Sequence, residues 1–262
     1  MLTLHTFAIS HFSEKIRWVL RVAGLPFVEV TLVPGLHMPT TLWLSRRATT
    51  VPIITGDGLR VQGSDRILAR LGARFDLSAV LPDDPDEHQA CLAAAAAHDA
   101  LGRHVMRWVY RPLVRQPGAM LMMWTLSATP TEAFAIKQLL PVLLPGFKRS
   151  FGIDDAHGAE ARDGISRALD AIDRRRAGAD TLAGAFTVED LSVCALLAPL
   201  AAPAAHPIYA HPTVRALMAE AIAPWERHPT LQWVREVYAR HRPLEPQQSP
   251  LMLAAARIPP RR

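Results

Sequence analysis

The hydrophobic and polar positions at the start of the chain follow two periods in succession. Residues 2–7 alternate apolar and polar side chains, which is typical of a strand. From Ser10 onward the apolar side chains recur at helical spacing, until Gly24 and Pro26 mark the end of a helix. The pattern therefore predicts a strand followed directly by an amphipathic helix.

The same two periods predict the rest of the first 75 residues. Further strands are expected at 27–32, 51–54 and 59–61, and further helices at 38–45 and 65–74. The turn at 55–58, Thr-Gly-Asp-Gly, has hairpin chemistry. We therefore predict a β-α-β-α-β-β-α domain at residues 1–75 and a linker at 76–86, which is rich in proline and aspartate.

Beyond the linker the pattern is helical throughout, which predicts an all-α domain at residues 87–243. A single alanine-rich helix is expected at 86–111, and a helix interrupted by Pro141 and Pro145 within 131–150. Other helices are expected at 156–177, 188–200, 211–221 and 228–241. The helix at 188–200 is apolar on all sides, so it is predicted to be buried in the centre, and 244–262 is predicted to be a loosely ordered tail.

Composition limits the classes of function. Half of the 262 residues are hydrophobic, which is enough for two buried cores. The net charge of +5 comes from scattered arginines without a basic stripe, which argues against a nucleic-acid partner. No stretch has the length of a membrane span and no secretory signal is visible, so a cytoplasmic protein without a membrane partner is expected. Cys91 and Cys194 show no metal-ligand spacing and are expected to be buried free thiols.

Three short motifs lie where chemistry is expected. The segment Ser10-His11-Phe12-Ser13 follows the first strand and opens a helix, and Thr50-Val51-Pro52-Ile53 opens the third strand. Gly63-Ser64-Asp65-Arg66-Ile67 opens the third helix. Serine is a common helix cap and proline a common first residue of an edge strand, so each motif also has a purely structural interpretation.

In this order the motifs resemble those of the cytosolic glutathione transferases, over almost the whole chain from Leu2 to about His241. The resemblance implies a thioredoxin-like α/β domain followed by a helical bundle, and glutathione as co-substrate. A fourth motif, Thr187-Val188-Glu189-Asp190, resembles the capping box in that family's second domain. The resemblance further implies a homodimer and a role in detoxification.

Carried over residue by residue, the resemblance assigns roles in the first domain. Ser10 and Ser13 occupy the first and last positions of the active turn, where a hydroxyl at a helix N-terminus stabilises the glutathione thiolate. The bond between Val51 and Pro52 is expected to be cis, which turns the Val51 backbone towards the cysteinyl part of glutathione. His37 is placed near the glycyl carboxylate of glutathione.

The γ-glutamyl end of glutathione is assigned to the start of the third helix. Ser64 and the helix N-terminus hold the γ-glutamyl carboxylate. The acidic residue expected before this serine is replaced by Gly63, which leaves Asp65 as the candidate contact for the γ-glutamyl amine.

Two residue types that are missing from the first domain limit the reaction types that the site can carry out. No tyrosine precedes Tyr110, which argues against the tyrosine-activated type of glutathione transferase unless the second domain supplies the residue. The active turn has no cysteine, and a hydroxyl cannot form the disulfide that thiol exchange requires.

The second substrate is expected between the two domains. Its wall is assigned to His104, Arg107, Trp108 and Arg111 of the long helix, with the methionine-rich segment 120–124. Methionine and tryptophan at helical spacing are also typical of a core or a lid. The segment 112–150 is open to two interpretations, a cover over the site or a dimer surface.

Two functions stay open from the sequence. One is an enzyme in which the glutathione thiolate attacks a small apolar electrophile, with conjugation, isomerisation or reductive elimination as outcomes. The other is a binding or interaction protein that keeps the fold but has weak or no affinity for glutathione, and Gly63 is the feature that favours it.

Overall fold

The computed structural model describes residues 1–46 and 48–243, and opens with a four-stranded sheet. Its strands are β1 (Leu2–Thr6), β2 (Phe27–Thr31), β3 (Ile53–Gly56) and β4 (Leu59–Gln62), in the order β2-β1-β3-β4. Strand β1 runs parallel to β2 and antiparallel to β3, as Leu2 pairs with Phe27 and His5 with Ile53. The predicted tail, 244–262, lies outside the described residues.

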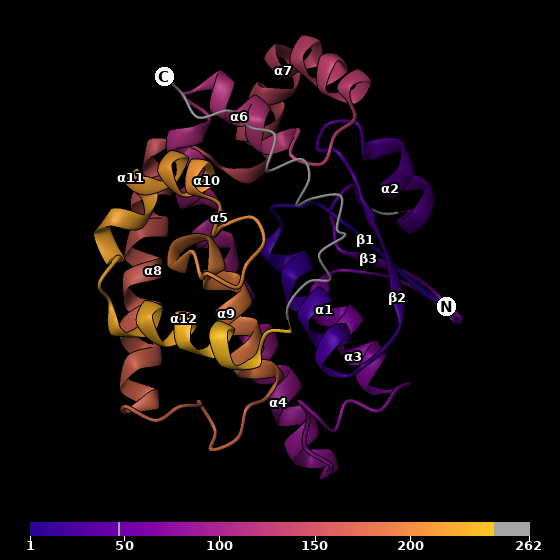
Figure 1. The fold of residues 1–262 in the computed structure, drawn as a ribbon, viewed down its shortest axis with the longest axis vertical. Coiled ribbons are helices and arrows are strands. Elements are labelled where there is room, and N and C mark those ends of the chain that lie inside the picture. Colours follow the sequence, from indigo (N-terminus) through magenta and orange to yellow (C-terminus); the bar gives the residue numbers. More distant parts are fainter. Residues whose placement is uncertain (47, 244–262) are drawn as a thin grey trace.

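Three helices flank the sheet, and Figure 1 shows α1 and α3 together on one side of it and α2 on the other. They are α1 (His11–Val22), α2 (Met38–Ser45) and α3 (Ser64–Gly72). The apolar stripe of α1, with Ile16 and Leu20 fully buried, packs under the Leu2 and Leu4 side chains of β1. This packing carries the N-terminus of α1 to the end of β1 and fixes the turn between them.

The remainder of the described chain is helical and lies beside the sheet domain (Figure 1). Its helices are α4 (Pro85–Ala97), α5 (Asp99–Leu113), α6 (Pro117–Trp124), α7 (Pro130–Phe151), α8 (Asp155–Arg176), α9 (Val188–Ala201), α10 (Pro212–Leu217), α11 (Ala219–Ile222) and α12 (Pro229–His241), with a 3-10 turn at Ala223–Trp225. A thioredoxin-like α/β domain followed by an all-α region is therefore the observed fold class, as predicted.

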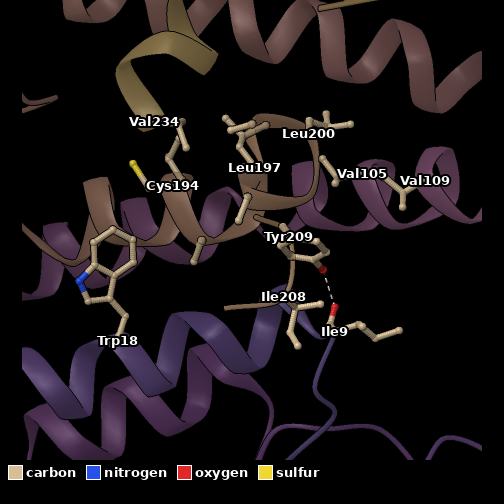
Figure 2. Packing of buried hydrophobic residues seen from close by; sticks show 14 of the residues in the cluster. Ile9, Trp18, Val105, Val109, Cys194, Leu197, Leu200, Ile208, Tyr209 and Val234 are labelled. Atoms are coloured by element: carbon tan, nitrogen blue, oxygen red, sulfur yellow. Dashed lines mark hydrogen bonds between the residues drawn. The ribbon is translucent and has the colours of Figure 1, made fainter. Parts of the chain in front are cut away.

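Helix α9 forms the centre of the helical region, and every one of its residues is buried. It packs against α1, α4, α5 and α12, and Figure 2 shows Cys194 beside Val234 on one side of α9 and Trp18 on the other. Its start is the predicted capping box, in which the Thr187 N–H donates to the Asp190 carboxylate over 2.9 Å. The same carboxylate accepts from the Leu182 N–H over 2.7 Å, so Asp190 also fastens the preceding loop.

Two predicted helices differ from the structure. The single helix expected at 86–111 is divided at His98 into α4 and α5. The break is held by long-range contacts, because His98 bonds the Glu189 carboxylate over 3.0 Å and Asp99 pairs with buried Lys15 over 3.2 Å. The interruption expected at Pro141 and Pro145 is absent, since α7 is continuous and carries both prolines on its exposed side.

The structure also bears on the predictions for the two cysteines and for membrane-spanning helices. Cys194 is buried as predicted, whereas Cys91 on α4 is only half-buried, and both are free thiols. Within residues 1–46 and 48–243, no helix is both long enough and apolar enough to traverse a bilayer.

Candidate active site

The active turn connects β1 to α1 and presents Ser10 as the N-cap of α1. The Ser13 N–H donates to the Ser10 Oγ over 3.1 Å, which satisfies one of the orphan donors at the helix start. As acceptor in that bond, the Ser10 hydroxyl keeps its own proton for another partner. A half-buried hydroxyl at the positive end of α1 is suited to donate to a thiolate.

Ser13 lies deeper than Ser10. Its side chain is fully buried, and its Oγ has no hydrogen-bond partner among the described residues. Of the two predicted catalytic serines, Ser10 is therefore the less buried residue.

The Val51–Pro52 peptide bond is cis, as the resemblance implied. The loop before it is tied down by Gln62, whose amide donates to the Thr50 carbonyl over 2.7 Å. The Pro52 carbonyl accepts from the Gly63 N–H over 3.0 Å, which joins this loop to the start of α3. The backbone groups of Val51 make no bond within the described residues, so they are free to pair with a ligand.

The start of α3 brings Ser64 and Asp65 beside Gly63. Ser64 is almost fully buried, whereas Asp65 is exposed and its carboxylate bends back towards Gly63. One carboxylate oxygen of Asp65 lies 3.3 Å from the point where a Cβ on Gly63 would be. A negative charge thus stands close to the position of the missing acidic side chain, with the Arg66 guanidinium at the same distance from that point.

Gly63 itself has φ 95° and ψ 132°, a conformation that favours glycine. We expect Gly63→Ala to lower the free energy of unfolding by about 1–3 kcal/mol, because any side chain there is held at an unfavourable φ. Urea unfolding measures the change. The control is Gly118→Ala in α6, where a Cβ meets open space and the change is expected to be neutral or stabilising. Equal effects of the two substitutions would contradict this account of Gly63.

The His37 ring stabilises its own loop through two hydrogen bonds. Its Nδ1 accepts from the Gly35 N–H over 3.0 Å, so its Nε2 carries the proton and donates to the Thr49 carbonyl over 2.8 Å. The ring meets Phe7 edge-on at 4.6 Å, and burial lowers the pKa of His37. With both nitrogens engaged, this neutral ring has no N–H left for the glycyl carboxylate.

The four α5 side chains that the sequence analysis assigned to the second substrate contact other helices of the helical region. Arg107 donates to the Phe151 carbonyl over 3.1 Å, Trp108 to the Ala221 carbonyl over 2.8 Å, and Arg111 to the Asp155 carboxylate over 2.9 Å. The His104 ring lies against Gly164 of α8. These four side chains occupy the face of α5 that meets α8 and α11, so their placement does not support the assignment.

The opposite face of α5 meets the active turn. Gly102 lies against Phe12, and its carbonyl accepts a hydrogen bond from the His11 Nε2–H over 3.0 Å. Apolar residues of α5 and α6 surround a gap of only about 10 Å³ behind the turn. Its lining is Ile9, His11, Val105, Met106, Val109, Tyr110, Leu113, Met123, Pro199 and Tyr209. The repeat of valine at 105 and 109 was the sequence signal for this face.

A larger groove of about 600 Å³ lies beyond β4, between α2 and α3. Arg66 and Arg70 of α3 border it above an apolar floor that includes Ile53 and Val61. Arg60 also borders it, but its guanidinium already donates to the carbonyls of Trp43 and Leu44. The groove meets the candidate site at Arg66, which lies next to Gly63, and at Gln62, which holds the Thr50 carbonyl.

Comparisons with known proteins bear on the N-terminal domain and on the fold. Residues 4–79 match the family model of the glutathione S-transferase N-terminal domain. The glutathione S-transferase of Methylobacillus flagellatus KT, solved with glutathione bound, superposes with a TM-score of 0.61 at 15% identity, covering 93% of this chain and 100% of the other. Residues 4–79 therefore match a glutathione S-transferase N-terminal domain, and the chain shares the fold of that solved structure.

Two further solved structures have the same fold. The glutathione S-transferase of Methylobacterium radiotolerans JCM 2831, in complex with glutathione sulfonate, has a TM-score of 0.51 at 20% identity and covers 95% of this chain and 97% of the other. The beta-etherase LigF of Sphingobium sp. strain SYK-6 has a TM-score of 0.56 at 15% identity, with 90% and 98% covered. No curated protein matches the chain by sequence.

Proposed function

We propose that this protein is a glutathione-dependent enzyme in which Ser10 stabilises the thiolate of bound glutathione for attack on an apolar electrophile. The observation that carries the proposal is the half-buried Ser10 hydroxyl at the start of α1, which keeps a proton to donate. The glutathione S-transferase family match over residues 4–79 and the glutathione-bound structure of the same fold support it.

Each part of the site has one task in this proposal. The free backbone groups of Val51 pair with the cysteinyl unit, and Ser64 with the N-terminus of α3 holds the γ-glutamyl carboxylate. Asp65 meets the γ-glutamyl ammonium. Ser10 donates to the sulfur, which lowers the thiol pKa and raises the fraction of nucleophile at neutral pH.

The reaction then needs little further chemistry from the protein. The thiol proton passes to solvent, the thiolate sulfur forms a bond to an electrophilic carbon, and the leaving group departs with the electron pair of the bond that breaks. Where a second glutathione thiolate attacks the sulfur of the conjugate, the sulfur–carbon bond breaks and glutathione disulfide forms. The carbon keeps the electron pair of that bond and takes a proton from solvent, so the outcome is reductive elimination. The apolar residues of α5 and α6 near the turn would contact an apolar electrophile only if the gap of about 10 Å³ between them widened.

The γ-glutamyl part of the proposal is tested by Asp65→Asn. We expect this variant to weaken glutathione binding by about tenfold, because it removes the charge that faces the ligand ammonium. Calorimetric titration with reduced glutathione measures the dissociation constant. Asp83→Asn, in the linker and exposed, changes the net charge equally and should bind as the wild type does.

The outcomes separate the two functions that the sequence left open. Saturable binding by the wild type that Asp65→Asn weakens supports the enzyme. No binding by the wild type at cellular glutathione concentrations would overturn the proposal in favour of a protein that has kept the fold for another partner. A cytoplasmic homodimer that acts in detoxification is the setting that we propose for the enzyme.

A further inference from the structure

The peptide group between Ile9 and Ser10 is held at both ends. Its carbonyl accepts a hydrogen bond of 2.5 Å from the hydroxyl of Tyr209, which Figure 2 shows reaching across from the helical region. Its N–H donates to the Phe7 carbonyl over 3.1 Å. Because a peptide group is planar, these two bonds fix the orientation of the whole unit that precedes Ser10.

The side chain of Ser10 is then oriented by its own bond from the Ser13 N–H, over 3.1 Å. The Ser10 carbonyl accepts from the Glu14 N–H over 2.9 Å as the first bond of α1. Backbone and side chain of Ser10 are thus determined from four directions. Only one of these four bonds comes from outside the turn and its helix, and that is the bond from Tyr209.

Tyr209 is itself well held. It lies between α9 and α10 and is 3% exposed. Its N–H donates to the His206 Nδ1 over 3.1 Å, and the two rings pack at 4.4 Å. Burial raises the pKa of the Tyr209 phenol, so the hydroxyl remains a donor at neutral pH.

The helical region also contacts the residue after Ser10. The His11 Nε2 lies 3.0 Å from the Gly102 carbonyl of α5, and the His11 side chain is 5% exposed. This contact holds the first turn of α1 against the helical domain. It does not act on the peptide group before Ser10, which leaves that task to Tyr209.

We propose that Tyr209 is a positioning residue that sets the direction of the Ser10 hydroxyl towards the glutathione sulfur, an inference that rests on the function proposed above. Its phenol is committed to the Ile9 carbonyl, so it acts on the reaction through Ser10. A donor held in place before the charge develops stabilises that charge better than one that must reorient. The helical domain therefore contributes to thiol activation as well as to binding of the second substrate.

The test compares Tyr209→Phe with Tyr238→Phe. Tyr238 is a fully buried phenol of the same core, with its hydroxyl 3.5 Å from Glu14 and away from the turn backbone. In Tyr209→Phe we expect kcat to fall by about tenfold, because a donor displaced by a fraction of an ångström loses much of its effect. The glutathione dissociation constant should stay within about twofold, and the bound thiol should ionise at higher pH than in the wild type and in Tyr238→Phe.

A second readout does not depend on glutathione. Hydrogen–deuterium exchange of residues 7–12 should be faster in Tyr209→Phe than in Tyr238→Phe, because the turn has lost its bond from the helical region. Unchanged exchange, or unchanged thiol ionisation with glutathione bound, would overturn the positioning role. Absence of glutathione binding by the wild type would instead refute the proposed function, while faster exchange would still support Tyr209 as the residue that holds the turn.

Discussion

Replacing Ser10 with alanine is expected to lower kcat by about 10²–10³-fold, the usual loss when one donor to a developing anion is removed. The glutathione dissociation constant should change by less than about threefold, since most of the ligand's polar groups are held elsewhere. The variant also loses the N-cap of α1, which costs about 1 kcal/mol of stability. Steady-state kinetics and calorimetry on the same preparations measure the two quantities.

Ser13→Ala is the matched control for this prediction. The buried Ser13 Oγ has no partner in the described part of the chain, so its removal should leave stability and turnover near those of the wild type. Ser10→Thr keeps both the cap and the hydroxyl and should retain activity. Loss of turnover in Ser13→Ala, with Ser10→Ala unaffected, would move the role of thiolate donor to Ser13.

Glu14→Gln is expected to be the most destabilising conservative change in the first domain, at about 3–5 kcal/mol. The Glu14 carboxylate is fully buried and bonds Arg242 over 2.6 Å and Arg17 over 2.5 Å. Arg17 in turn pairs with Glu29 over 2.6 Å. Neutralising Glu14 removes the buried negative charge that the Arg242 guanidinium contacts, and this contact joins the two domains.

The control is Glu226→Gln, which breaks an exposed pair with Arg215 at 3.2 Å. An exposed ion pair contributes at most about 1 kcal/mol, so urea unfolding should separate the two variants clearly. Equal midpoints for Glu14→Gln and Glu226→Gln would show that the buried cluster does not stabilise the domain contact.

The same cluster predicts a pH dependence. Burial opposes the charge on Glu14, but the positive charge around it, first that of Arg242, holds the pKa of Glu14 well below its usual range. A depressed carboxyl pKa contributes stability that is fully present above the unfolded value of about 4.3 and is lost as the pH falls below it. The wild type should therefore lose stability on acidification below about pH 4 more steeply than Glu14→Gln does.

Local features of the sequence were sufficient for the sheet domain and for the start of α9. Strand alternation, the serine cap at Ser10 and the Thr187 capping box all act over a few residues, and each is present in the structure. Glycine stands at position 63 in place of the expected acidic residue, and the positive φ of Gly63 is a conformation that glycine adopts readily. Short-range chemistry of this kind survives in any tertiary context.

Features that depend on contacts between residues far apart in the sequence could not be predicted from the sequence. The division of α4 from α5 depends on Glu189 and Lys15, and nothing near His98 in the sequence indicates it. Which face of α5 meets the active turn depends on how α5 packs against α8 and α9, and the sequence analysis assigned the ligand wall to the other face. Basic side chains suggested a ligand wall, whereas their partners are the carbonyls of Phe151 and Ala221 and the carboxylate of Asp155.

The contacts between the helical region and the active turn with its helix α1 are the hardest to predict from the sequence. Tyr209 meets Ile9 and Arg242 meets Glu14 across most of the length of the chain. No periodicity links such pairs, since each is decided by the docking of the two domains. These are also the contacts that extend the candidate site beyond what its motifs define.

Thiolate absorbance of glutathione bound to the wild type and to Ser10→Ala, followed against pH, tests the central claim most directly. We expect the wild type to lower the thiol pKa of bound glutathione by one unit or more, which corresponds to about 1.4 kcal/mol of stabilisation of the thiolate per unit. In Ser10→Ala the thiol pKa should return towards its value in free solution. The same ionisation curve in both proteins would contradict a role for Ser10 in stabilising the thiolate.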